Sequence, residues 1–268
     1  MKNKLGNCAL CRSTADLQES HLIAAGFYRL MREEASVNPN PIVISGGMAR
    51  ATSNQIKMGL LCRACEQRFN DNGENYVLAN CARQDGSFGL RDSLIRRTPF
   101  HQEEGLAIYD LCHLPGVADQ LLYFGASVFW RASVGRWKDR DRNLPLISLG
   151  RYEEEFRRYL LGEAPFPQKV ALILHISKEA QPDMTVAFPC TNRDSGFFRH
   201  KFYVLGLSFI MYVGNRMPES ATVGSLSSKE KPVAWLCSLT DDSLLEAVAR
   251  DAKQAKMARG LKSLVGVA

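Results

Sequence analysis

The chain has 268 residues, of which 46% are hydrophobic and 23% charged, and its formal net charge is +6. This composition excludes a disordered or collagen-like chain and predicts a folded protein with one large core or two smaller ones. The basic balance suits a nucleic-acid or phosphate partner, although it does not demand one.

The N-terminal residues, MKNKLGNCALC, lack the apolar run of a signal peptide. The longest apolar run, YVLGLSFIMYVG, is too short for a membrane span and suits one or two buried strands. We therefore expect a cytoplasmic protein with no membrane segment, in which thiols stay reduced.

The first third of the chain is rich in polar turn signals. DLQESHLI alternates as a short strand does, VNPNPIVISGGMARATSN reads as a loop, and QIKMGLL reads as a second strand. CEQRFNDNGENYVLANCARQ then suits a helix, which Gly73 interrupts or weakens. The expected order is strand, loop, strand, helix.

From about residue 104 the hydrophobic pattern becomes helical. LPGVADQLLYFGASVFWRASVGRW has a broad apolar face, on which Phe124, Phe129 and Trp130 are expected in the core. EEEFRRYLLG predicts a second helix that ends at its glycine. Four β-rich segments come next, and then a charged terminal helix with Asp241 as its expected N-cap.

These patterns predict an α+β protein in three parts. Residues 1–100 form the N-terminal unit, residues 101–165 a helical segment, and residues 166–268 a β-rich α+β domain with a terminal helix. We expect any homo-oligomer contact or protein partner to use the C-terminal region.

Two Cys-x-x-Cys pairs, Cys8/Cys11 and Cys62/Cys65, are separated by 50 residues. Zinc takes four ligands tetrahedrally, and thiolates two residues apart reach one ion, so the two pairs supply a full set. A redox pair of the thioredoxin type would need only one such motif. The sequence therefore predicts a structural zinc site. The other cysteines are expected to be buried thiols: Cys81, Cys112, Cys190 and Cys237.

The segments CALC, ESHLI and NQIKMGLLCRACEQRFNDNGE together resemble the zinc-stapled HNH endonucleases, over roughly residues 8–80. The resemblance implies a zinc-bound ββα-metal unit and metal-dependent hydrolysis of DNA phosphodiester bonds. The stretches FGASVFWRAS and ISLGRYEEEFRRYLLG are also similar to the regions after such units in uncharacterised bacterial proteins, and that similarity implies no mechanism.

By the resemblance, His21 matches the general base that activates the attacking water. Glu66 and Asn70 match ligands of a catalytic Mg²⁺ or Mn²⁺, one helical turn apart. Glu19 and Glu74 are further candidate ligands for this cation, and Asn54 is the candidate that orients His21.

Two positions depart from the family pattern. Ser20 stands where the family usually has a metal ligand, and Lys57 and Met58 stand where it has the asparagine that orients the base. These departures keep a second interpretation open, a non-catalytic zinc-stabilised module that binds nucleic acid or a protein. In either case Lys57, Arg63 and Arg68 are the candidate phosphate contacts.

Overall fold

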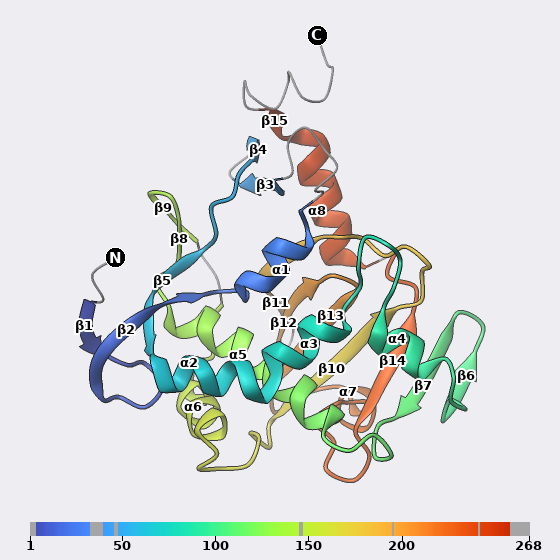
Figure 1. Ribbon diagram of the computed structural model, residues 1–268. Coiled ribbons are helices and arrows are strands. Elements are labelled where there is room, and N and C mark those ends of the chain that lie inside the picture. Colours follow the sequence, from blue (N-terminus) through green and yellow to red (C-terminus); the bar gives the residue numbers. More distant parts are fainter. Residues whose placement is uncertain are drawn as a thin grey trace.

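The computed structural model describes residues 4–32, 40–45, 48–144, 147–194, 196–240 and 242–257. Helices and strands alternate along these segments in a mixed α+β fold, as the sequence predicts (Figure 1). Within the described residues, no helix has the length and apolarity that crossing a membrane requires.

The N-terminal unit is an antiparallel three-stranded sheet followed by a helical run. Its strands, in the order β1-β2-β5, are β1 (Lys4–Asn7), β2 (Thr14–His21) and β5 (Lys57–Cys62). The helical run consists of α2 (Arg63–Phe69), the π-helical turn η1 (Asn70–Glu74) and α3 (Asn75–Asn80). Gly73 therefore lies in a π turn, and the helix continues past it. The expected order of strand, strand and helix is present.

The segment between β2 and β5 contains more structure than the loop we expected. After the short helix α1 (Ala25–Leu30), β3 (Ile42–Ser45) and β4 (Met48–Ala51) pair antiparallel. The terminal strand β15 (Lys256–Met257) adds to β4 in parallel. The loop prediction was wrong here because β3 and β4 pair with each other, with Ser45 opposite Met48, and the Gly-Gly pair between them in the sequence is a hairpin signal that the loop interpretation overlooked.

The largest element is a seven-stranded sheet in the order β11-β12-β13-β10-β14-β7-β6. Its strands in chain order are β6 (His101–Glu103), β7 (Leu106–Asp110), β10 (Val170–Ser177), β11 (Val186–Asp194), β12 (Phe197–Val204), β13 (Leu207–Gly214) and β14 (Val233–Cys237). β10 and β14 are parallel, and the other neighbours are antiparallel. Residues 101–110 were expected at the start of a helical segment. They form strands instead because β14 offers them a backbone partner.

The remaining helical elements and one small hairpin complete the described fold. These elements are α4 (Gly89–Leu94), α5 (Val117–Val134), η2 (Gly150–Tyr152), α6 (Glu153–Leu161), α7 (Glu219–Val223) and α8 (Ser243–Gln254), with a small hairpin of β8 (Lys138–Asp139) and β9 (Arg142–Asn143). α6 ends as predicted at Gly162, which adopts a left-handed φ of 77°. The expected cap of α8 was wrong by one residue: the Asp242 carboxylate caps the helix, and Asp241 lies outside the described residues.

Helix α5 is the centre of the molecule. A Cβ on Gly125 would lie 2.8 Å from both Leu172 of β10 and Phe209 of β13, so this helix packs closely on the sheet. Against η1, a Cβ on Gly73 would lie 2.8 Å from the backbone nitrogen of Phe124. α5 is therefore held between the N-terminal unit and the sheet (Figure 1).

The aromatic residues of α5 are buried as predicted. Phe124 and Phe129 are fully buried, and Trp130 is 1% exposed. They belong to one hydrophobic cluster that also contains Leu22 from the N-terminal unit and Leu236 from the C-terminal part. Residues from all three predicted parts thus share a continuous core.

Substituting Gly73 by alanine tests the close packing of η1 on α5. The added methyl group would press on backbone atoms that cannot rotate away, so we expect a loss of about 1–3 kcal/mol in the free energy of unfolding, measured by urea denaturation. Gly59→Ala is the matched control, because its Cβ would meet Leu17 at an ordinary 3.6 Å. Equal stabilities of the two variants would contradict the packing described here.

Candidate functional site

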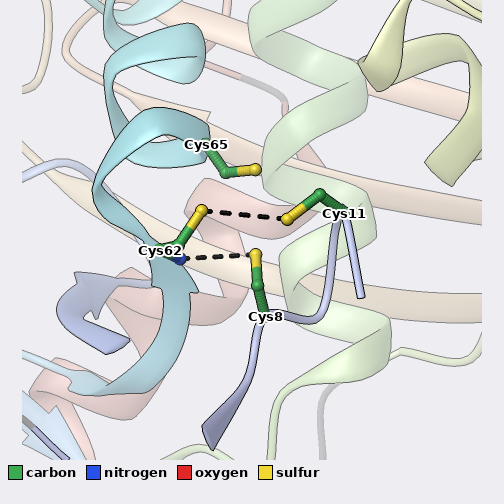
Figure 2. Close-up of side chains that lie close together, drawn as sticks. All are labelled: Cys8, Cys11, Cys62 and Cys65. Atoms are coloured by element: carbon green, nitrogen blue, oxygen red, sulfur yellow. Dashed lines mark hydrogen bonds between the residues drawn. The ribbon is translucent and has the colours of Figure 1, made fainter. Parts of the chain in front are cut away.

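The four paired cysteines come together at the base of α2. Cys8 and Cys11 lie in the turn between β1 and β2, which Arg12 closes with a left-handed φ of 64° and a 2.8 Å bond from its backbone nitrogen to the Cys8 carbonyl. Cys62 ends β5, and Cys65 lies in the first turn of α2. Figure 2 shows the four side chains converging, with all sulfur atoms within 4.8 Å of one another.

This arrangement fits zinc. A Zn–S distance of about 2.3 Å implies sulfur–sulfur separations of about 3.8 Å around a tetrahedral ion. The sulfurs of Cys11 and Cys62 lie 3.8 Å apart, and the Cys62 backbone nitrogen donates to the Cys8 sulfur at 3.3 Å (Figure 2). Across the described segments, this is the one group of three or more Cys, His, Asp or Glu ligand atoms close enough to hold a metal.

The thiols are electrostatically coupled. A hydrogen bond from Cys65 lowers the pKa of Cys8 to about 4, and the same bond raises the pKa of Cys65. Burial raises the pKa of Cys62. The negative charge therefore gathers on one sulfur, because adjacent thiolates repel each other. Ionising all four requires the positive charge of a bound cation.

The cysteines outside the cluster differ in burial. Cys81 is buried as predicted, and Cys190 and Cys237 are half-buried. Cys112 is exposed, so the prediction of a buried thiol was wrong there. It lies just after the end of β7, where its backbone nitrogen donates to the Asp110 carboxylate at 2.8 Å and the chain turns at the surface.

His21 ends β2 and faces Lys57 across the sheet. Its ring is half-buried, and burial lowers the pKa of its imidazole, with smaller contributions in the same direction from the charges of Lys57 and Arg131. A side-chain hydrogen bond with Gln55 acts in the opposite sense. The imidazole is therefore neutral at pH 7 and able to accept a proton.

Glu66 extends from the first turn of α2, one residue after the zinc-site Cys65. Its Oε1 is buried and has no hydrogen-bond partner within the described part of the chain. Burial raises the pKa of the Glu66 carboxyl, and a side-chain interaction with Ser20 opposes this increase. Ser20 itself is fully buried, and its hydroxyl accepts a bond from the Leu61 backbone nitrogen at 3.0 Å. Ser20 thus connects the end of β2 to α2.

Glu74 forms a buried ion pair with Arg131 of α5. The Arg131 Nη2 lies 2.6 Å from the Glu74 Oε1, and the two side chains are 1% and 5% exposed. The Arg131 Nη1 donates to the backbone carbonyl of His21 at 2.9 Å. Its guanidinium also lies over the Phe69 ring, 5.3 Å from the centroid. One buried cation therefore joins three elements around the candidate site.

The other candidate residues are placed less centrally. Asn70 begins η1 and is half-buried. Glu19 is exposed and pairs with Lys57, with 2.6 Å between Oε2 and Nζ. Asn54 is exposed, and its backbone nitrogen donates to Thr52. It is Gln55, the next residue, whose side chain bonds to His21.

Both remaining basic candidates lie on the surface of α2. Arg63 is exposed, and the exposed Arg68 donates to the carbonyl of Leu161 at 3.2 Å. Sequence reasoning missed Gln55 and Arg131. Arg131 had a visible signal, since it is a single charge inside the apolar stretch FGASVFWRAS.

Comparison of the chain with models of known families, with curated proteins and with solved structures finds no significant match. The resemblance to HNH endonucleases accordingly depends on the residues of the N-terminal unit alone.

Removing a zinc ligand should unfold the N-terminal unit. We expect the protein to contain one zinc ion per chain, measured by mass spectrometry of the metal, and Cys65→Ser to lose it. The loss should lower the free energy of unfolding by about 4 kcal/mol or more, because the metal supplies folding energy. Cys112→Ser, at an exposed cysteine outside the cluster, should keep both metal and stability. Full zinc content in Cys65→Ser would refute the assignment.

The buried Arg131–Glu74 ion pair should contribute far more to the free energy of unfolding than an exposed ion pair does. Arg131→Met leaves the Glu74 carboxylate buried without its cation, which costs about 3–5 kcal/mol in the free energy of unfolding. Lys57→Met removes the cation from the exposed pair with Glu19 and should cost less than about 1 kcal/mol. Urea denaturation measures both. Similar losses in the two variants would show that burial of the pair has no energetic consequence.

Proposed function

We propose that residues 4–80 act as a zinc-stabilised, metal-dependent endonuclease of the HNH type that hydrolyses DNA phosphodiester bonds. The observation that carries this proposal is the buried Glu66 oxygen, which has no partner in the described residues, on the helix that follows β5, the strand paired with the His21 end of β2. His21 and Glu66 are connected through Ser20, which precedes the first and interacts with the second. This chemistry requires a neutral base and an available oxygen ligand, and His21 and Glu66 supply these two groups.

In this mechanism His21 takes the proton from the attacking water. Burial keeps its imidazole neutral, and the bond with Gln55 holds the ring in one orientation. The Arg131 bond to the His21 carbonyl fixes the backbone at the end of β2. Each of these contacts limits the movement of the base relative to α2.

Glu66 and Asn70 would hold the catalytic Mg²⁺ or Mn²⁺. Their oxygens are of the kind that hard cations prefer, and the buried Glu66 Oε1 has no protein partner to give up within the described segments. Such a cation, when bound, stabilises the negative charge on the scissile phosphate and on the leaving oxygen. Glu19 and Glu74 contribute less directly, because Lys57 and Arg131 already neutralise them.

DNA is the substrate that the charges favour. Lys57, Arg63 and Arg68 belong to β5 and α2, the two elements that meet at Cys62, and the chain as a whole is basic. Contacts from these side chains to the phosphates would make binding weaken as salt increases.

A second candidate function is a non-catalytic zinc-stabilised binding module. The ion pairs of Glu19 and Glu74 favour it, because they remove two of the four carboxylate or amide candidates from direct metal binding. Ser20 favours it too, since its buried hydroxyl supports the backbone of β5.

A plasmid-cleavage assay with added Mg²⁺ or Mn²⁺ tests the nuclease. We expect wild type to cut, and His21→Ala to cut at least about 100-fold more slowly, because it lacks the base. Glu66→Gln should also be impaired, and more added metal should partly restore it. His101→Ala, at an exposed histidine paired with Glu103, is the matched control and should cut normally. Zinc content must be equal in all four proteins.

Absence of cutting by wild type with either metal would overturn the nuclease proposal. Salt-dependent DNA binding by that inactive protein would then support the binding module. Cutting that survives in His21→Ala would remove His21 from the mechanism.

A further inference from the structure

A cavity of about 1010 Å³ lies at the first turns of α5, at the opposite end of that helix from Arg131. None of the four cysteines of the cluster lines it. Its walls come from the first turns of α5, the end of α6, strands β7, β10 and β14, and the segment 220–233 after the start of α7. This volume is at the upper end of the range of small-molecule pockets in proteins, about 300–1,000 Å³. None of the residues used in the proposed nuclease lines it.

Four aromatic side chains from separate parts of the chain face this cavity: Phe100, Tyr159, Phe166 and Trp235. Tyr159 and Phe166 are packed edge to face, with ring centroids 5.3 Å apart. The Trp235 indole nitrogen donates to the Gly224 carbonyl at 2.7 Å, which fixes that ring against the segment 220–233. Such walls offer flat apolar surfaces at fixed positions.

The rim of the cavity is unusually apolar for a surface. Phe100 is 60% exposed and Val223 is 68% exposed, and both line the cavity. They are among the most exposed large hydrophobic residues of the described chain. A ligand that entered the cavity would remove this apolar surface from water.

The charged residues of the lining cancel. Asp119 and Glu230 oppose Lys229 and Lys231, and Lys231 is already engaged, with its Nζ 3.2 Å from the centre of the Phe100 ring. An ionised ligand would therefore find no net charge to pair with.

The polar groups of the lining that could contact an uncharged ligand are hydroxyl groups. Ser227 is already used, since its hydroxyl accepts from the Leu172 backbone nitrogen at 3.0 Å and donates to Ser225. The hydroxyl of Ser228 accepts a bond from the Lys231 nitrogen at 3.2 Å and retains its own proton as a donor. The Ser228 hydroxyl therefore suits a neutral acceptor atom on the ligand.

We propose that this cavity binds an uncharged, mostly apolar small molecule that contains an aromatic ring. The ring packs among the four aromatic side chains, and a neutral acceptor atom faces the Ser228 hydroxyl. This proposal does not depend on the nuclease. The ligand would contact Ala118 and Leu122 near the start of α5, the helix whose last turn binds the His21 carbonyl through Arg131.

Fluorescence titration of the full zinc-loaded chain with N-phenyl-1-naphthylamine, a neutral two-ring probe, tests the proposal. We expect saturable binding of one probe per chain. Ala118→Trp places an indole in the cavity and should weaken binding at least ten-fold. Ala79→Trp is the matched control, on the exposed surface of α3, and should bind as wild type does. Val223→Asp, at an exposed rim position that folding tolerates, should weaken binding at least three-fold.

The anionic analogue 8-anilinonaphthalene-1-sulfonate tests the charge assignment. It should bind at least ten-fold more weakly than the neutral probe, because the lining offers no net positive charge. Tighter binding of the anion would overturn the uncharged class of ligand. Absence of saturable binding by wild type, or equal binding by folded Ala118→Trp and wild type, would overturn the site itself.

Discussion

The buried guanidinium of Arg131 is the constraint on which the arrangement of the candidate site depends. A charge that is 1% exposed is tolerated only when it is paired and hydrogen-bonded. Glu74 supplies the opposite charge, and the carbonyl of His21 accepts a second bond. Because these partners belong to η1 and β2 while Arg131 belongs to α5, the three elements have little freedom to move relative to one another. The π turn of η1 also brings Gly73 onto the backbone of α5, so charge pairing and close packing act at the same junction.

The cysteine cluster provides the other restraint on the N-terminal unit. The cluster joins the two ends of this unit's sheet and helical run, and a bound zinc ion would add folding free energy there. The cluster joins the turn before β2 to the start of α2. It therefore determines how His21, at the far end of β2, stands relative to Glu66 in the first turn of α2. A metal held by the cluster would be structural, and the proposed chemistry would belong to the residues that the cluster positions.

Helix α5 connects the candidate site of the N-terminal unit with the cavity. Its first turns line the cavity, and its last turn holds Arg131. Between them, Gly125 brings the helix onto β10 and β13 so closely that no side chain fits. The shared core also connects residues 101–110, which join the sheet, to the helices that come after them.

The sequence by itself determined the features whose cause is local. Cysteine spacing predicted a cluster that can hold a metal, alternation predicted β2 and β5, and a glycine at the required left-handed position predicted the end of α6. The apolar faces of α5 likewise predicted its burial. Each of these signals depends on residues a few positions apart, which share a turn, a strand face or a helix face.

Only the tertiary structure decided the features that need a distant partner. β15 pairs with β4, and β7 pairs with β14, and each of these pairings joins strands that lie far apart in the sequence. Gln55 rather than Asn54 reaches His21 because of how the chain enters β5, and Arg131 finds Glu74 from 57 residues away. The cavity is lined by residues of α5, α6, α7, β7, β10 and β14 and of the segments that connect them. Burial and pairing are properties of the assembled chain. In the folded protein, Arg131, a single charge in an apolar helix, is buried, pairs with Glu74 and bonds to the carbonyl of His21.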